Sequence, residues 1–149
     1  KQYPGVAYRS ADLMRRDVQD NIDLTNIAYL DESVDVFICS HVLEHIPDDR
    51  KAMRELRRIL RPGGFGLMLV PLVIGVDETT EEQGKTSIEY RWKHFGMGDH
   101  VRQYGIRDFV DRLTASGLKV DKLGIGHFGA ETFRRHGIAE NSVLYVVRR

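Results

Sequence analysis

The most suggestive residues in this 149-residue sequence form a short histidine motif, His41-Val-Leu-Glu-His45. It matches H-x-x-E-H, a zinc-peptidase pattern in which two histidines one helical turn apart share the metal and the glutamate activates a metal-bound water. The motif directly follows an apolar segment, however, and Pro47 comes two residues after His45. A zinc peptidase needs both histidines inside a longer helix and a further ligand. A zinc hydrolase that uses His41, Glu44 and His45 is therefore the less favoured interpretation, and two histidines on a short turn beside a cleft are favoured.

A second polar group, Asp99-His100-Val-Arg102 with Tyr104, ends a long polar segment. A histidine next to a carboxylate can act as a general base near neutral pH, so His100 is a candidate catalytic residue. Arg102 could hold an anionic group of a substrate. The alternative is that His100 is a solvated or structural loop histidine.

Two aspartates follow predicted strands at positions where α/β sheets bind ligands. Asp12 could accept hydrogen bonds from both hydroxyls of a ribose. Asp23 could accept one from an exocyclic amine such as that of adenine. Each also suits a purely local role, because aspartate caps helices and forms turns with its own backbone.

The pattern of apolar residues predicts strands and helices that alternate through the middle of the chain. Residues 34–39 are nearly all apolar, which is typical of a parallel strand covered on both faces. Ala52, Met53, Leu56 and Ile59 form one stripe of a helix that ends at Pro62-Gly63-Gly64. The other predicted strands are 6–11, 21–25, 65–72, 118–125 and 142–147, and the other predicted helices span 106–113 and 130–136. This order predicts an α/β domain with a mostly parallel sheet and a final strand pair that can be antiparallel.

The segment 73–101 is long, polar and without strong periodicity. Such segments are unusual in compact domains and tend to be functional loops or lids. We expect it to contribute to a binding site.

Composition limits the possible classes of protein. The length predicts a single domain, 1–149, and 22 basic residues balance 22 acidic ones, which argues against a nucleic-acid partner. No apolar run approaches the roughly 20 residues that cross a bilayer, so no membrane partner is expected. A single cysteine, Cys39, fits a reducing, cytoplasmic setting. The first residue is Lys1, so the chain is expected to be processed or to be part of something longer.

Two stretches together resemble a known enzyme family. Asp35-Val-Phe-Ile-Cys-Ser-His-Val-Leu-Glu-His-Ile46 and Leu56-Arg-Arg-Ile-Leu-Arg-Pro-Gly-Gly64 are similar to the class I S-adenosylmethionine-dependent methyltransferases, most of all their small-molecule branch. In that family the corresponding motif spans the fourth strand, the next helix and the turn into the fifth strand. Phe95 to Tyr104 extends the similarity more weakly.

The resemblance implies a Rossmann-like fold, S-adenosylmethionine as cofactor and a small-molecule methyl acceptor. Asp12 falls where the family binds the ribose, Asp23 and Leu24 where it holds the adenine edge, and Ser40 and His41 where it lines the methionine part and the donor methyl. His41 and Glu44 then lie at a helix start beside the cleft, and no metal is expected.

For the acceptor, the resemblance places the segment 73–101 at the pocket. Tyr90, Trp92 and Tyr104 are available to line it, and Arg102 to hold a charged group. Methyl transfer depends mainly on alignment, because the cofactor is already activated. A base is needed only if the acceptor must lose a proton, and His100 is the first candidate.

The chain departs from the family at its start. The glycine-rich turn after the first strand, which packs against the cofactor, is absent from the sequence, so we expect an N-terminally incomplete domain. Since that first strand is central in the family, its absence predicts a gap in the sheet with exposed edges. A missing segment, a second copy of the chain in a homo-oligomer, or direct pairing of the flanking strands would cover them. The alternative function is a non-catalytic remnant of the fold that acts through association.

Overall fold

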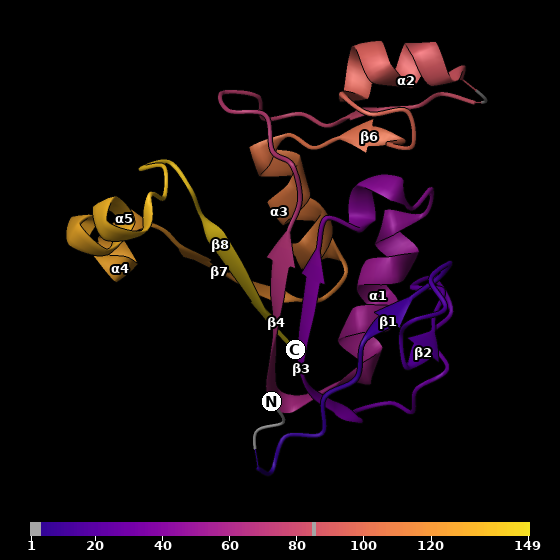
Figure 1. The fold of residues 1–149 in the computed structure, drawn as a ribbon, viewed down its shortest axis with the longest axis vertical. Helices are drawn as coiled ribbons and strands as arrows, with labels where there is room; N and C mark the ends of the chain where they lie inside the picture. The colour runs from indigo at the N-terminus through magenta and orange to yellow at the C-terminus, as the bar shows by residue number, and fades with distance from the viewer. Residues whose placement is uncertain (1–3, 85) are drawn as a thin grey trace.

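The computed structural model describes residues 4–84 and 86–149, and its main element is a four-stranded sheet (Figure 1). The strand order is β3-β4-β8-β7. The bounds are β3 Val34–Ser40, β4 Leu60–Leu69, β7 Lys119–Leu123 and β8 Leu144–Arg148. β3 and β4 are parallel, and β8 runs antiparallel to both β4 and β7. The final strand thus returns between β4 and β7.

Two small sheets and six helical segments complete the part of the chain that the structure describes. The small sheets are β1 (Ala11–Asp12) with β2 (Asp20–Asn21), and β5 (Thr80–Glu81) with β6 (Arg102–Gln103). The helices are η1 Leu43–His45, α1 Asp49–Ile59, α2 Ile88–Phe95, α3 Ile106–Ala115, α4 Ile125–Phe128 and α5 Ala130–His136. The predicted α/β class and the antiparallel final pair are confirmed. The four-stranded sheet is mixed rather than mostly parallel, because β8 opposes both of its neighbours.

The pairing of β3 with β4 depends on two glycines. Phe37 and Gly66 are direct cross-strand partners, and a Cβ on Gly66 would lie 2.1 Å from the Phe37 ring. A Cβ on Gly64 would lie 2.6 Å from the backbone oxygen of Asp35. Glycine therefore lets the two strands and the Phe37 ring approach each other. The predicted helix terminator at 62–64 lies within β4, where the register of pairing shifts.

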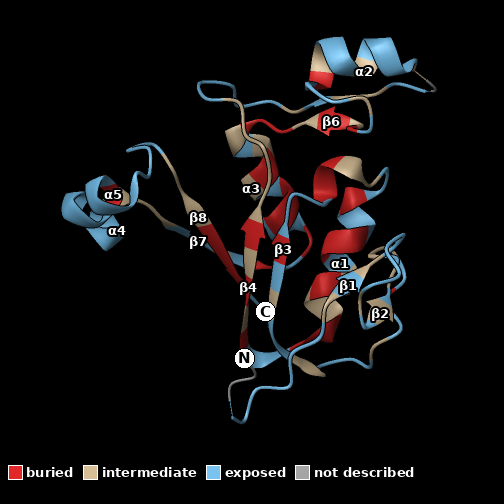
Figure 2. Ribbon diagram, viewed as in Figure 1, coloured by how far each residue is buried: buried red, intermediate tan, exposed pale blue. Residues whose placement is uncertain are grey.

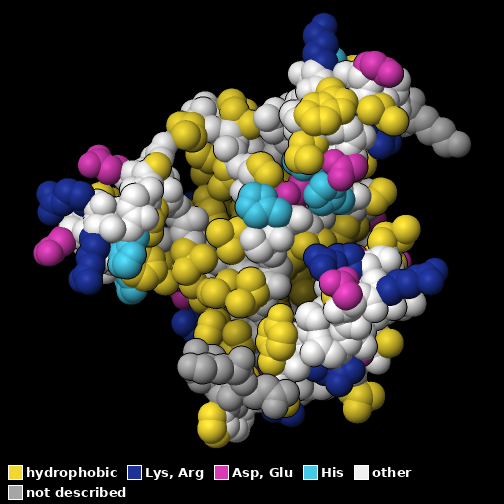
Figure 3. Space-filling model, in the orientation of Figure 1, with side chains coloured by type: hydrophobic (Ala, Val, Ile, Leu, Met, Phe, Trp, Pro, Cys, Tyr) yellow, Lys and Arg dark blue, Asp and Glu magenta, His cyan; other side chains and the backbone are white. Residues whose placement is uncertain are grey.

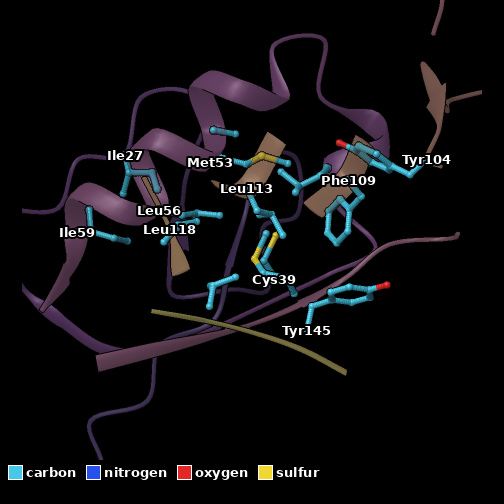
Figure 4. Packing of buried hydrophobic residues seen from close by; sticks show 14 residues of the cluster. Ile27, Cys39, Met53, Leu56, Ile59, Tyr104, Phe109, Leu113, Leu118 and Tyr145 are labelled. Atoms are coloured by element: carbon cyan, nitrogen blue, oxygen red, sulfur yellow. The ribbon is translucent and has the colours of Figure 1, made fainter. Parts of the chain in front are cut away.

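α1 and α3 cover one face of the sheet and supply most of its core. Asp48 caps α1 by accepting a hydrogen bond from the backbone N–H of Lys51 at 2.9 Å. The apolar stripe of α1 faces inward as predicted, and Figure 4 shows it meeting α3 and the sheet. The labelled members of this cluster are Ile27, Cys39, Met53, Leu56, Ile59, Tyr104, Phe109, Leu113, Leu118 and Tyr145.

The segment 73–101 is not a continuous loop, because it contains β5 and α2. Ser87 caps α2 by accepting from the backbone N–H of Tyr90, and Gly96 ends it in the left-handed conformation. Its apolar pattern is weak because the helix is short and packs on the fold mainly through Phe95, its buried residue. Figure 2 shows that the rest of α2 is largely exposed or half-buried.

On the opposite face, the apolar side chains of β3 are exposed, and the outer edge of this strand is unpaired within the described residues. Val36 and Ile38 are 47% and 68% exposed. Figure 3 shows apolar side chains gathered across the centre of this face. β1 pairs with β2 in a separate sheet, so within residues 4–84 and 86–149 the strands that flank the expected gap do not pair directly. The predicted opening in the sheet is therefore present along β3.

Candidate functional site

The chain turns sharply where β3 ends, at Ser40 and His41. Ser40 is the direct partner of Leu69 at the end of β4, and the backbone N–H of His41 donates to the Leu69 oxygen at 2.9 Å. His41 then adopts a φ of +54°, which is uncommon for a residue with a side chain. Such conformations cluster at binding sites, and this one lies at the carboxyl edge of the parallel strands, where α/β sheets bind ligands.

Asp12 ends β1 and forms the local turn expected as its structural alternative. Its Oδ1 accepts hydrogen bonds from the backbone N–H groups of Arg15 and Met14, at 2.9 and 2.8 Å. These bonds lower the pKa of Asp12 below its usual value, so the carboxylate stays ionised. With Oδ1 engaged by the turn, Oδ2 can accept a hydrogen bond from a ligand. The local role and the predicted ribose contact are thus compatible.

Asp23 repeats this arrangement just after β2. Its Oδ1 accepts from both the backbone N–H and the hydroxyl of Thr25, each at 2.8 Å. Both bonds lower the pKa of Asp23. Leu24 is half-buried and packs against the core, which fixes the turn in place. Oδ2 of Asp23 can accept from an amine.

An apolar pocket of about 400 Å³ opens at the same edge of the sheet. The end of β4, the end of β7, the start of β8 and helices α4 and α5 surround it, and its lining residues are Leu69, Leu123, Phe128, Thr132, Phe133, Ile138, Ser142, Val143 and Leu144. Leu69 connects this pocket to the turn at Ser40 and His41. The sequence analysis did not find this pocket, although the apolar residues within 125–138 were a usable signal.

The histidine motif does not form the helical zinc-peptidase arrangement. η1 is a three-residue 3-10 helix, and His41 lies before it in the left-handed conformation. The two motif histidines are therefore not on successive turns of one helix. Nδ1 of His41 lies 3.4 Å from Oε1 of Glu44, whereas His45 pairs with His100, ring centroids 4.7 Å apart in an edge-to-face contact.

His100, the predicted base, is 7% exposed. Its Nδ1 lies 3.1 Å from the backbone oxygen of Phe95. His100 is thus an ordered, buried side chain rather than a solvated loop histidine, and its neighbours are Glu44 and His45.

Arg102 and Tyr104 require a correction, because both are internal. Arg102 is 2% exposed, and its two terminal nitrogens donate to the backbone oxygens of Leu43, Ile46 and Pro47. Tyr104 is fully buried and donates to Asp49 at 2.6 Å. Burial and the charge of Asp49 raise the pKa of Tyr104. Arg102 stabilises the backbone of η1 and the residues after it through these hydrogen bonds, and Tyr104 is a core residue. Neither side chain is free to contact an acceptor.

Arg102 also borders a second, more polar hollow of about 220 Å³. Glu81 and Glu82 line the same hollow. Because carboxylates face it, an anionic substrate group does not fit there.

Tyr90 and Trp92 lie on α2. Tyr90 stacks on His94 with ring centroids 3.8 Å apart. Tyr90 is 40% exposed and Trp92 is 58% exposed. Neither lines the apolar pocket at β4, α4 and α5. A role for them in acceptor binding stays a prediction that requires α2 to move or the acceptor to extend toward it.

Cys39 is 5% exposed on the core side of β3. Burial, with the charge of Glu44, raises the pKa of its thiol to about 12. A thiol that stays protonated is unreactive, so Cys39 is a packing residue.

Comparison with known proteins finds methyltransferases. A family model described as "Methyltransferase domain" matches residues 7–68. A probable S-adenosylmethionine-dependent methyltransferase of Mycolicibacterium smegmatis is 30% identical over 135 residues, which is 89% of this chain and 48% of that protein. Residues 7–68 therefore match a methyltransferase domain, and the chain is similar to S-adenosylmethionine-dependent methyltransferases.

Two further relatives extend this result. Thiol S-methyltransferase TMT1B of Rattus norvegicus is 32% identical over 84 residues, 52% of this chain and 32% of that protein. The crystal structure of an S-adenosylmethionine-dependent methyltransferase from Mesorhizobium loti has the same fold, with a TM-score of 0.55 and 16% identity over 86% of this chain and 67% of that one. The chain spans about a third to a half of the curated relatives it matches.

The proteins that this chain resembles include S-adenosylmethionine-dependent methyltransferases, so S-adenosylmethionine and its demethylated product are the ligands to consider for the site. The turns at Asp12 and Asp23 fit the cofactor, because each leaves one carboxylate oxygen for a hydroxyl or amine donor. Within the part of the chain that the structure describes, no helix is long and apolar enough to cross a membrane.

Proposed function

We propose that this chain transfers a methyl group from S-adenosylmethionine to a small, largely apolar acceptor. One observation carries the proposal: the apolar pocket and the turn at Ser40 and His41 share Leu69 at the carboxyl edge of β3 and β4. An acceptor in this pocket would lie next to the position where the family lines the donor methyl.

The chain's own residues would bind and orient the two reactants. Oδ2 of Asp12 accepts from the ribose hydroxyls, Oδ2 of Asp23 accepts from the adenine amine, and the turn at Ser40 and His41 lines the methionine part. The cofactor supplies a methyl already activated on a sulfonium sulfur. The walls of the pocket exclude water and align the acceptor, which is the main requirement of this reaction.

A thiol is the first acceptor to test. Three curated relatives, from rat, mouse and human, are named thiol S-methyltransferases. An apolar pocket suits the hydrocarbon part of a small alkyl or aryl thiol. We expect methylated product, detected by mass spectrometry, with such a thiol and S-adenosylmethionine. Parallel reactions with a phenol and an amine identify the acceptor atom.

Cofactor binding is tested by calorimetric titration of the purified chain with S-adenosylmethionine and its demethylated product. In Asp12→Asn the Oδ1 acceptor of the turn is kept, but the free oxygen becomes an N–H₂ group that cannot accept. A lost hydrogen bond to a charged acceptor costs about 1.5–3 kcal/mol, so we expect binding to weaken about tenfold or more. Asp17→Asn, an exposed aspartate of the same loop, is the control. If the well-folded wild-type chain gives no heat of binding with either compound, the proposal is wrong for this chain on its own.

A second function, association without catalysis, is favoured by the open edge of β3 and the exposed Val36 and Ile38 beside it. In this alternative the fold is kept as a docking element, and a second copy of the chain covers the sheet. A well-folded chain that self-associates but binds no cofactor would support it over methyl transfer.

A further inference from the structure

Three side chains from two distant segments bring metal-ligating atoms together above the carboxyl end of β3. One carboxylate oxygen of Glu44 and one ring nitrogen each of His45 and His100 lie within 4.8 Å of one another. Glu44 and His45 belong to η1, and His100 precedes β6. Figure 3 shows histidine and acidic side chains gathered beyond the apolar centre of the open face. The cofactor contacts proposed above use none of these three residues.

Buried hydrogen bonds hold the two segments together. The backbone N–H of Val101, next to His100, donates to the backbone oxygen of Glu44 at 2.9 Å. Arg102 donates to the oxygens of Leu43 and Ile46 at 2.7 and 2.5 Å. The backbone that carries Glu44, His45 and His100 is therefore held in place, as a metal site requires.

Glu44 is the strongest indication that the cluster binds something. Its side chain is 2% exposed, and its Oε2 has no hydrogen-bond partner among residues 4–84 and 86–149. Oε1 lies 3.4 Å from Nδ1 of His41. A buried carboxylate oxygen without a partner is costly, and a cation at Oε2 would remove that cost.

Both histidines contact a backbone oxygen through Nδ1. Nδ1 of His100 lies 3.1 Å from the oxygen of Phe95, and Nδ1 of His45 lies 3.3 Å from the backbone oxygen of Asp99. A carbonyl only accepts, so Nδ1 is the donor in each contact, and Nε2 is the nitrogen that a neutral ring offers to a metal. Metal-binding histidines are typically oriented in this way, by donation from their other nitrogen.

We propose that Glu44, His45 and His100 form a binding site for a divalent transition metal ion. Two imidazole nitrogens and one carboxylate oxygen are a known ligand set for Zn²⁺ that leaves a fourth position open. The ligands of tetrahedral zinc lie about 3.3 Å apart, given bond lengths near 2.0–2.1 Å, so small side-chain rotations would close the site. This is not the H-x-x-E-H arrangement, because His100 takes the place of His41.

The open position would face a water or a heteroatom of a substrate. If that heteroatom belongs to the methyl acceptor, the metal would hold it and favour its deprotonated form; this consequence rests on the proposed methyl transfer, whereas the metal site itself does not. His100 is then a metal ligand and not a free base.

The test is calorimetric titration of the chelator-stripped chain with ZnCl₂, and titration with Co²⁺ followed by visible absorption, both without S-adenosylmethionine. We expect one ion per chain and a higher Tm with metal. Glu44→Gln and His100→Ala should each weaken Zn²⁺ binding by at least about 100-fold, since even outer ligand partners contribute 10–100-fold.

The controls separate a metal site from general effects on folding. His127→Ala removes an exposed histidine far along the chain and should bind Zn²⁺ as the wild type does. Glu44→Gln should unfold cooperatively with a Tm close to that of the metal-free wild type, but should lose the rise in Tm caused by Zn²⁺. Asp12→Asn should keep the metal site whatever its effect on the cofactor. The proposal is overturned if the wild type does not bind Zn²⁺, or if Glu44→Gln and His100→Ala bind Zn²⁺ as tightly as the wild type.

Discussion

At the scale of single residues, Asp49 is the centre of a buried polar network that holds the site segments in place. Its Oδ2 accepts from Tyr104 at 2.6 Å and from Arg112 at 3.0 Å, and Nε of Arg102 lies 3.7 Å away. Arg112 also pairs with Glu81, which fixes β5 and β6 against α3. Asp49 therefore lies between two arginines that are almost fully buried, and Glu81 and Asp108 supply further negative charge to them.

Asp49→Ala should destabilise the protein strongly, because it leaves two buried guanidinium groups short of a counter-charge. Breaking a buried ion pair from one side costs about 3–5 kcal/mol. The measurement is the free energy of unfolding in urea. Asp121→Ala, which breaks the half-exposed pair with Arg148, should cost about 0–1 kcal/mol. Similar losses in the two variants would contradict the assignment of Asp49 as the centre of the network.

At the scale of elements, the parallel pair β3–β4 positions the turn at Ser40 and His41. Phe37 lies across Gly66 and also packs against the core, so the two strands can keep their spacing only if residue 66 has no side chain. The register of this pair then places Ser40 opposite Leu69 and brings the turn to the apolar pocket.

Gly66→Ala should push the Phe37 ring away from the core. Overpacking of this kind costs about 1–3 kcal/mol in the free energy of unfolding. Gly126→Ala is the matched control, because a Cβ there meets nothing within 4 Å, and Ala is the better helix former. Thermal or urea unfolding of both variants measures the difference. A Gly66→Ala protein as stable as wild type would show that Phe37 can move without cost.

At the scale of the whole molecule, the sheet is covered on one face by α1 and α3, and on the other face β3 is exposed (Figures 1 and 2). An open strand edge beside exposed apolar side chains favours pairing with another chain. The Rossmann-like fold is thus present with one of its faces unshielded in this chain.

We expect this face to promote self-association. Wild-type chain should show a molar mass that rises with concentration in light scattering, and Ile38→Lys should lower it toward the monomer, because a charge on the open face opposes apolar contact. Ile74→Lys changes an isoleucine that is 74% exposed outside the sheet and should have no effect. A wild type that stays monomeric at all concentrations would mean that the open face is not self-complementary.

Local patterns in the sequence determined much of the fold. The apolar run at 34–39, the stripe from Ala52 to Ile59 and the periodicity of 106–113 each reflect a single element, so the neighbouring residues were sufficient to predict it. The family motif likewise lies within one strand, one helix and the turn between them. Helix α2 was missed because only Phe95 is buried in it, which leaves little periodic signal.

The positions of long-range partners were decided only by the tertiary structure. Arg102 and Tyr104 have the residue types of a binding site, yet they face inward because Asp49, 53 and 55 residues earlier, meets them across α1 and β6. Sequence spacing placed His41 with His45, whereas the folded chain places His45 with His100. The sequence therefore determined the family resemblance and the elements, since these depend on local pattern. The tertiary structure determined which polar side chains share a site, since that depends on how distant segments pack.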